Sequence, residues 1–239
     1  MPSRDRATGV ASASRFPDPR ESDPDGLVAV GGKLEPDWLL DAYRRGIFPW
    51  PQRPGEPMLW WSPDPRAIMP LDGLNVSRRL RRTIRSRRYR VTANNDFAGV
   101  LHGCATGPGR EEGTWLFDSM RRAYQRIHEL GHAHSVECWL DDRLVGGVYG
   151  VAIGGLFAGE SMFHYATDAS KVALTALVAQ LRTRGYTLFD IQQWTPHTGR
   201  MGAVETARDE YLRRLDEALA GAASFGEFDE ATLLAYASG

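Results

Sequence analysis

Residues 135–163 read SVECWLDDRLVGGVYGVAIGGLFAGESMF, and this stretch decides the fold. Its segments 135–140 and 144–153 carry the β-branched, aromatic and aliphatic residues that favour strands, and Asp141-Asp142-Arg143 between them predicts a hairpin turn. The segment 155–163 extends the sheet by one more strand. Three neighbouring strands near the centre of the chain therefore predict a sheet as the framework of the protein.

Helical patterns and further strands lie on both sides of this sheet in the sequence. Ser77 is a predicted N-cap for an Arg-rich helix, and the residues around Tyr89 alternate as a short strand. The other predicted elements are helices over 117–130, 169–184 and 206–219 and a strand over 188–192. Gly131 and Gly185 stand where the first two of these helices should end. This order of elements predicts an α+β fold with helices flanking a mixed sheet.

The chain before residue 67 differs in composition from the rest. Residues 1–15 are small, polar and aperiodic, which predicts a mobile tail. Residues 16–66 are crowded with Pro, Gly and Trp, and they contain one predicted helix that opens at Pro36-Asp37 and stops at Gly46. We therefore expect a small N-terminal domain over 16–66 and the sheet-based domain over 67–239.

The overall composition is that of a soluble globular protein. Of the 239 residues, 42% are hydrophobic and 25% are charged, and the sequence has no run of about 18 apolar residues that could span a bilayer. The N-terminus lacks the apolar segment of a secretory signal. The two cysteines, Cys104 and Cys138, are too few for a disulfide framework. We therefore expect a reduced protein of the cytoplasm.

Positive charge is concentrated in one short segment, although the formal net charge is only −1. Eight Arg fall between residues 78 and 90, and no acidic residue lies between Asp72 and Asp96. Like charges at this spacing repel one another unless an anion compensates them, and a nucleic-acid backbone is the usual anion. The candidate phosphate contacts are Arg78, Arg79, Arg81, Arg82 and Arg85.

Tryptophans supply flat surfaces on which a nucleobase could stack. Trp50, Trp60 and Trp61 fall within 12 Pro-rich residues, and Trp115 follows later in the chain. Because a Pro-rich stretch forms little core, this grouping favours a binding site over core packing.

Two further motifs have the residue types of known catalytic sites. His128-Glu129-Leu130-Gly131-His132 has the HExxH pattern of zinc proteases, which needs both His on one face of a continuous helix. Gly131 predicts a helix end inside the motif, and no third metal ligand of the expected kind follows, so we expect no metal. His102-Gly103-Cys104 brings a base near a thiol in sequence, but a single Cys is more often a small core residue.

A pair of polar residues interrupts the apolar strand predicted over 188–192. Asp190 and Gln192 are two residues apart and should therefore lie on the same face of that strand. Burying either one without a partner costs several kcal/mol, so they belong to a satisfied buried network or to a catalytic pair. Glu160, on the preceding predicted strand, poses the same question.

Several long motifs together resemble one family, the bacterial leucyl/phenylalanyl-tRNA–protein transferases. The resemblance covers about residues 16–215. The main matching motifs are GLVAVGG (26–32), AYRRGIFPW (42–50), WWSPDPR (60–66), EEGTW (111–115), LVGGVYGV (144–151), GESMF (159–163) and DIQ (190–192).

The resemblance implies both a fold and an activity. The fold would be a small N-terminal domain followed by an acetyltransferase-like (GNAT-like) domain that uses no coenzyme A. The activity would be transfer of leucine or phenylalanine from Leu-tRNA or Phe-tRNA to the N-terminal Arg or Lys of a protein, which marks that protein for degradation as an N-degron. The resemblance implies no metal and no organic cofactor, and we expect a monomer.

The resemblance also implies roles for individual residues. Asp190 and Gln192 would form the catalytic pair. The side chains that would hold the terminal adenosine of the tRNA are Trp50 and Trp115, with Tyr43 and Tyr124 nearby. The side chains that would line the amino-acid pocket are Met162, Val148, Leu174, Leu177 and Phe189.

Glu160 is our candidate for binding the acceptor, because an acid should meet the cationic first residue of that protein. The alternative is a structural carboxylate satisfied by backbone N–H groups or by His164.

This chemistry makes modest demands on the enzyme. The donor ester is already activated, so the enzyme mainly has to position two reactants. The attacking α-amino group has a pKa of about 7.7–8.0, so a weak base suffices. Gln192 would accept a hydrogen bond from the amine while Asp190 orients Gln192, or the 2′-hydroxyl of the tRNA would relay the proton.

Two other functions compete with aminoacyl transfer. A coenzyme A-dependent N-acetyltransferase is disfavoured because residues 165–169 lack the glycines of a pyrophosphate site at a helix N-terminus. An RNA-binding module without catalysis is disfavoured by Asp190, Gln192 and Glu160.

Overall fold

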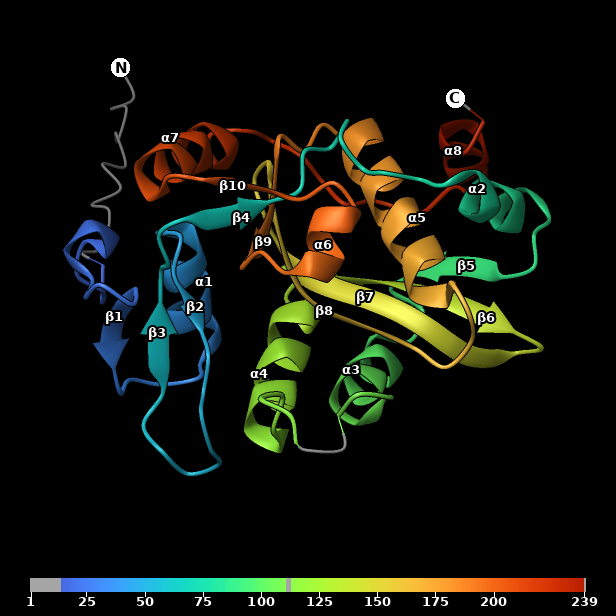
Figure 1. Ribbon diagram of the computed structural model, residues 1–239. Helices are drawn as coiled ribbons and strands as arrows, with labels where there is room; N and C mark the ends of the chain where they lie inside the picture. Colours follow the sequence, from blue (N-terminus) through green and yellow to red (C-terminus); the bar gives the residue numbers. More distant parts are fainter. Residues whose placement is uncertain (1–13, 111–112, 239) are drawn as a thin grey trace, which may run out of the picture.

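Two sheets organise the computed structural model, which describes residues 14–110 and 113–238 (Figure 1). Most of the predicted mobile tail lies outside the described residues, as do Glu111 and Glu112 of the EEGTW motif. Ser14 and Arg15, the last two residues of that predicted tail, both hydrogen bond to the carboxylate of Asp41.

The smaller sheet belongs to the N-terminal part of the chain. Its strand order is β1 (Leu27–Val30), β3 (Leu59–Trp61) and β2 (Phe48–Pro49), and both pairs are antiparallel. A short 3-10 helix, Pro19–Glu21, precedes β1, and the helix α1 spans Pro36–Arg44. As predicted, Pro36 begins this helix and Gly46 follows it with a φ of +71°. A Cβ at Gly46 would lie 2.7 Å from the Tyr211 ring, so the position requires glycine for space as well as for conformation.

The larger sheet has seven strands and carries the candidate site. Its order is β10 (Val204–Thr206), β4 (Arg66–Ile68), β9 (Leu188–Gln192), β8 (Leu156–His164), β7 (Arg143–Ile153), β6 (Ala133–Leu140) and β5 (Arg90–Ala93). The hairpin predicted from residues 135–153 is confirmed. Asp141 and Asp142 form its two-residue loop with φ values of +49° and +57°, the left-handed conformation that such loops need and that Asp tolerates.

One pair of strands in this sheet is parallel, and the sheet is therefore mixed, as predicted. β8 and β9 pair through Leu156 to Leu188, Phe157 to Phe189 and Ala158 to Asp190. The connection between them is the helix α5 (Ala169–Thr183), which is buried over most of its length. The parallel pairing ends at Ala158 and Asp190, whereas β8 continues to His164 beside β7.

Helices cover both faces of the larger sheet (Figure 1). The helices α3 (Phe97–Thr106) and α4 (Asp118–Glu129) lie on one face, and α5 lies on the other with α2 (Arg78–Arg85) and α8 (Glu230–Tyr236) packed beside it. The remaining helices are α6 (Pro196–Arg200) and α7 (Arg208–Leu219). The predicted N-cap is confirmed, since Ser77 Oγ accepts a hydrogen bond from the Leu80 N–H. No helix among the described residues is long and apolar enough to span a membrane.

The N-terminal part and the larger sheet share a hydrophobic core. Leu39 and Trp60 belong to the same buried cluster as Val100 of α3, Met120 of α4 and Tyr149 of β7. The predicted boundary between residues 66 and 67 falls inside β4, which belongs to the larger sheet. A second cluster fills the space between the sheet and α5. The core around α1 and Trp60 thus fixes the N-terminal part against the sheet beside the candidate site.

Candidate active site

A cavity of about 560 Å³ lies where β8 and β9 separate. Its wall includes the residues of β8 from Glu160 to His164, the end of β9 at Ile191 and Gln192, and Gln193 after it. Other parts of the wall are the loop 107–110, Trp50, Trp115, the N-terminal half of α6, Gly103 and Ser170. The separation of the two strands thus opens the sheet at the point where the polar residues Glu160 and Gln192 occur.

Trp50 and Trp115, which the sequence analysis assigned to the adenosine, meet on this wall. Their ring centroids are 5.6 Å apart with an angle of 20° between the planes, so the two indoles are stacked on each other. Trp50 is 37% exposed, which is high for an indole. Tyr43 and Tyr124 do not line the cavity; they lie buried behind it.

The prediction that Trp60 offers a stacking surface is wrong. Its side chain is fully buried, its Nε1–H donates to the Gly31 carbonyl at 2.7 Å, and its ring packs against Phe16 and Trp38. The Pro-rich segment does form core, because the short strand β3 is the middle strand of the smaller sheet. Trp61, next to it, is half-buried.

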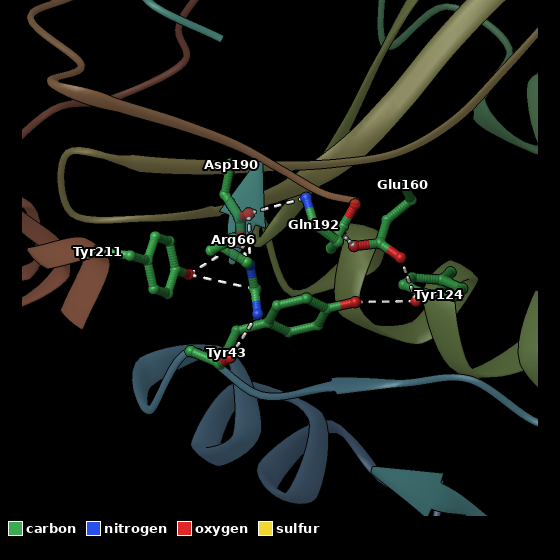
Figure 2. A network of polar contacts seen from close by, with 8 residues as sticks. Tyr43, Arg66, Tyr124, Glu160, Asp190, Gln192 and Tyr211 are labelled. Carbon is green, nitrogen blue, oxygen red and sulfur yellow. Dashed lines mark hydrogen bonds and ion pairs between the residues drawn. The ribbon is translucent and has the colours of Figure 1, made fainter. Parts of the chain in front are cut away.

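Asp190 is surrounded by hydrogen-bond donors (Figure 2). Arg66 Nε donates to its Oδ1 at 2.9 Å and Arg66 Nη2 to its Oδ2 at 2.6 Å, which is the two-pronged pairing that arginine makes with a carboxylate. The Tyr211 hydroxyl donates to Oδ2 at 2.9 Å, and the main-chain N–H of Gln192 donates to Oδ1 at 2.9 Å. Asp190 is 1% exposed and does not line the cavity. The carboxylate therefore acts as an acceptor for fixed groups of the protein.

Gln192 lies between Asp190 and the cavity. Its backbone has a φ of +58°, in the left-handed region that only glycine adopts without strain. Its side-chain Nε2 donates to Glu160 Oε1 at 2.9 Å. Among the described residues its Oε1 has no hydrogen-bond partner, although Gln192 is on the cavity wall. Asp190 and Gln192 thus interact through the main-chain N–H of Gln192, and not through the two side chains on one strand face as the sequence analysis expected.

Glu160 receives hydrogen bonds from two sides. Besides Gln192, the Tyr124 hydroxyl donates to its Oε2 at 2.7 Å, and the Tyr124 hydroxyl is 2.8 Å from that of Tyr43. Burial raises the pKa of the Glu160 carboxyl to about 7; the hydrogen bonds from Tyr124 and Tyr43 oppose this rise, and the charge of Asp190 adds to it. No hydrogen bond or ion pair joins Glu160 to His164 among the described residues; His164 Nδ1 lies 3.4 Å from Ser170 Oγ. A half-buried carboxylate on the cavity wall that titrates near neutral pH can meet a cationic ligand.

These contacts close into a ring that we call the polar ring (Figure 2). Arg66 Nη1 donates to the Gly46 carbonyl at 2.8 Å, and Gly46 follows Tyr43 by three residues along the chain. The members of the polar ring, in order of contact, are Arg66, Asp190, Gln192, Glu160, Tyr124, Tyr43 and Gly46. The sequence analysis did not single out Arg66 or Tyr211. The only signal for Arg66 was its place in the WWSPDPR motif, and nothing in that motif indicates a partner 124 residues away.

The five residues predicted for an amino-acid pocket divide into two groups. Met162 lines the cavity. Val148, Leu174, Leu177 and Phe189 are buried in the core cluster against which Met162 packs, and they do not line the cavity. Gly159 lets the Phe189 ring pack closely against β8, because a Cβ at this position would lie 2.8 Å from that ring.

The arginine segment has more protein partners than its sequence suggested. Arg81 and Arg85 donate to the carbonyls of Tyr236 and Ala237 at the end of α8, each at 3.3 Å. Arg79 pairs with Asp168 at 3.7 Å. The other ion pairs of the segment are Arg87 with Glu230 at 4.0 Å and Arg90 with Asp142 at 3.3 Å. Within the described part of the chain, Arg78 and Arg82 have neither an ion pair nor a side-chain hydrogen bond, and both are exposed. Arg78 and Arg82, one helical turn apart on α2, thus form the part of the segment most available to an external anion.

The structure supports neither a metal site at the HExxH motif, residues 128–132, nor a reactive thiol at Cys104. The helix α4 ends at Glu129, and Gly131 has a φ of +80°, so the helix end predicted inside His128–His132 is confirmed. No group of three potential metal ligands comes together among the described residues. Cys104 is buried, which raises the pKa of its thiol to about 12, whereas His102 points outward from the same helix.

Comparisons with known proteins agree on one family. A family model described as "Leucyl/phenylalanyl-tRNA protein transferase" matches residues 68–216, and one described as its N-terminal domain matches residues 32–64. The chain is 55% identical over 204 residues to the leucyl/phenylalanyl-tRNA–protein transferase of Nitratidesulfovibrio vulgaris strain DP4, which covers 85% of this chain and 87% of that protein. It is 48% identical over 215 residues to the protein of the same name from Yersinia enterocolitica, covering 89% and 90% of the two chains.

Among solved structures, "The structure of L-PGS from Bacillus licheniformis" matches with a TM-score of 0.38 and 15% identity, over 69% of this chain and 55% of that one. This score is too low to support an assignment of fold.

Proposed function

Because this chain belongs to the leucyl/phenylalanyl-tRNA–protein transferase family, we propose that it transfers leucine or phenylalanine from aminoacyl-tRNA to the N-terminal Arg or Lys of acceptor proteins. The modified protein would then carry a new N-terminus that directs its degradation. The observation that carries this proposal is the placement of Gln192 and Glu160 side by side on the wall of a cavity that also holds two stacked indoles.

The role of Gln192 follows from its hydrogen bonds. Its Nε2–H is used by Glu160, which turns the carbonyl end of the amide toward the cavity. This oxygen would accept a hydrogen bond from the acceptor's α-amino group and so direct the nitrogen lone pair at the ester carbon. The new amide bond forms as the ester bond to the ribose oxygen breaks, and the amine proton ends on that oxygen. Because a carboxamide does not hold a proton at neutral pH, we route the proton through the adjacent 2′-hydroxyl of the tRNA.

Glu160 would bind the cationic side chain of the acceptor's first residue. It is the one carboxylate among the described residues that line the cavity, whose wall also carries Arg110, His164 and His197, and its pKa of about 7 keeps it partly ionised at neutral pH. A site built around a carboxylate discriminates against neutral residues, because those would leave the charge unpaired.

Three features would bind the donor. Trp50 and Trp115 offer stacking surfaces for the terminal adenosine, with Tyr43 and Tyr124 supporting them from behind. The leucyl or phenylalanyl side chain would enter next to Met162, where the residues of the buried cluster, Val148, Leu174, Leu177 and Phe189, form the deeper apolar wall. Phosphates of the tRNA would meet Arg78, Arg79 and Arg82 of α2, while Arg81 and Arg85 also hold α8 in place.

The same proposal includes the finer features that the family resemblance suggests. We assign the larger sheet to the acetyltransferase-like (GNAT-like) class, supported by the parallel pair β8 and β9 with α5 between them. We propose that the protein acts as a monomer in the cytoplasm, where charged tRNA is found, and that it needs neither a metal nor an organic cofactor.

The direct test uses tRNA charged with radiolabelled leucine and two peptides that differ only in their first residue, Arg or Gly. Label should appear in the Arg peptide and not in the Gly peptide, and a chelator in the assay should change neither result. Failure of the folded protein to label the Arg peptide would contradict the proposed activity. Labelled acetyl-coenzyme A in place of the tRNA tests the competing acetyltransferase function, and it should label neither peptide.

A further inference from the structure

Only two members of the polar ring line the cavity. These are Gln192 and Glu160, whereas Arg66, Asp190, Tyr43 and Tyr124 are at most 2% exposed and lie behind them. Gln192 and Glu160 can therefore contact the substrates, whereas the buried members of the ring can act only by holding these two residues in position.

The guanidinium of Arg66 is held in place by contacts with several parts of the chain. Its guanidinium joins three elements: Asp190 on β9, the Gly46 carbonyl between α1 and β2, and the Tyr211 ring of α7, whose centroid lies 4.5 Å from the guanidinium carbon. The centroid of a second ring, that of Phe48, lies 4.9 Å from the same carbon. Two aromatic rings and a bidentate carboxylate leave the guanidinium no alternative orientation.

Asp190 transmits this fixed position to Gln192. Its Oδ1 accepts both Arg66 Nε–H and the main-chain N–H of Gln192, each at 2.9 Å. That second bond holds Gln192 in its left-handed conformation, which a residue with a side chain adopts only under constraint. Without it, the backbone at Gln192 would relax, and the side-chain amide would move away from the ester.

Tyr211 completes the support. Its hydroxyl donates to Asp190 Oδ2 at 2.9 Å, so Asp190 receives four hydrogen bonds, from Arg66 (two), Tyr211 and Gln192. An acceptor with four donors already in place has no capacity left for the reaction itself.

We propose that Arg66 and Tyr211 are positioning residues for the transfer reaction: they fix Asp190, and Asp190 fixes the backbone of Gln192 so that its amide faces the reacting groups. The catalytic residue is then Gln192, and Asp190 acts only through it. Arg66 also ties this arrangement to the turn after α1, so the segment that carries Tyr43 and Trp50 and the strand that carries Gln192 are held in one relative position. This inference rests on the proposed function.

The first experiment uses Tyr211→Phe, which removes one donor to Asp190 and leaves the ring and its packing in place. We expect kcat for peptide leucylation to fall about 10-fold, with KM for Leu-tRNA and for the Arg peptide unchanged within about 2-fold. The matched control is Tyr89→Phe, which deletes another tyrosine hydroxyl, one that donates to the Thr167 carbonyl at 2.7 Å away from the polar ring. The control should lose stability but not kcat.

The second experiment asks whether Tyr211 acts through Gln192. In a Gln192→Ala background, Tyr211→Phe should cause no further loss of kcat, because the group it positions is already absent. A merely structural tyrosine would lower kcat by the same factor in both backgrounds, and that result would overturn the proposal.

Arg66→Lys provides an independent measurement. It keeps the charge and loses the two-pronged geometry, so kcat should fall about 10- to 100-fold while KM for the Arg peptide stays near that of the wild type. If this variant does not fold by circular dichroism, the decision rests on Tyr211→Phe. Wild-type protein that fails to label the Arg peptide would refute the proposed function, whereas an active wild type with unchanged kcat in folded Tyr211→Phe would refute the positioning role alone.

Discussion

At the scale of single residues, the protonation of Glu160 changes the charge of a cavity that Arg110, His164 and His197 also line. Burial raises the pKa of its carboxyl from 4.5 to about 7, so the folded protein binds this proton more tightly than the unfolded chain does. The ionisation of Glu160 therefore lowers folding stability as pH rises from about 4.5 to 7, by about 3 kcal/mol or less at 1.4 kcal/mol per pH unit. Ionisation in turn creates the charge that, in our proposal, pairs with the cationic acceptor.

This coupling predicts how acceptor binding depends on pH. The ionised fraction of Glu160 rises about 10-fold between pH 6 and pH 8, so KM for an Arg peptide should fall by a similar factor in the wild type. Glu160→Gln should raise KM at pH 8 and remove this part of the pH dependence, and it should raise the melting temperature at pH 8 but not at pH 5. The acceptor's α-amino group titrates alike in both proteins, so the difference between their KM profiles isolates Glu160. Parallel KM profiles would mean that Glu160 is a structural carboxylate.

At the scale of secondary-structure elements, α2 presents two different faces. Leu80 and Ile84 pack into the core, and Arg81 and Arg85 satisfy carbonyls at the end of α8. Arg78 and Arg82 are exposed one turn apart on the opposite face. We expect the Arg78→Gln/Arg82→Gln variant to bind charged tRNA with a log K versus log salt slope that is shallower by about 1.4 to 1.8, the contribution of two phosphate contacts.

The matched control for α2 is the Arg213→Gln/Arg214→Gln variant, which removes the same charge from α7. Both of these arginines pair with Glu210, and Arg213 also pairs with Glu217, so they are already compensated within their own helix. Its salt slope should match that of the wild type. Equal flattening in both variants would show that net charge, and not the α2 surface, determines tRNA affinity.

At the scale of the whole molecule, the N-terminal part and the larger sheet share a buried cluster, so we expect them to unfold together. Leu39 of α1 is fully buried in the cluster that also contains residues of α3, α4 and β7. Leu39→Ala should therefore lower the free energy of unfolding by about 2–5 kcal/mol and shift the transitions followed by tryptophan fluorescence and by circular dichroism together. Val30→Ala, on an exposed residue of the same part, should change stability by less than about 0.5 kcal/mol. Two separate transitions in urea would instead support an independent domain over 16–66.

The sequence predicted those elements whose conformation is determined by residues close to one another in the chain. The Asp141-Asp142 loop and the Ser77 cap depend on residues within a few positions, and both are found. The helix α3 was missed because Gly99 and Gly103 weaken its helical signal. The side chain of Asp96 caps its N-terminus by accepting from the Gly99 N–H, and Gly103 lets the Phe163 ring approach to 2.5 Å of where a Cβ would stand.

The sequence predicted which residues belong to the candidate site, but not which residues hydrogen bond to one another within it. The sequence pointed to Gln192, Glu160 and the indoles, but the partners of Asp190 come from β4 and α7, and only folding brings them together. Trp60 was assigned to the site because Pro-rich segments rarely form core, and that rule failed where a three-residue strand was the middle of a sheet.

The stacked pair of Trp50 and Trp115 gives the protein an optical signal at its cavity. Of the seven tryptophans in the chain, these two are the ones whose rings lie on the cavity wall. A nucleobase that binds between or upon them must exchange their mutual contact for contacts with itself, so the net gain is the difference between two stacking energies of about 1–3 kcal/mol each. The terminal adenosine alone should therefore bind weakly, and aminoacyl-adenosine should quench the emission of the wild type more than that of Trp115→Phe, in which Trp50 is the one indole left on the wall. Such quenching would give a continuous readout of donor occupancy without any label on the tRNA.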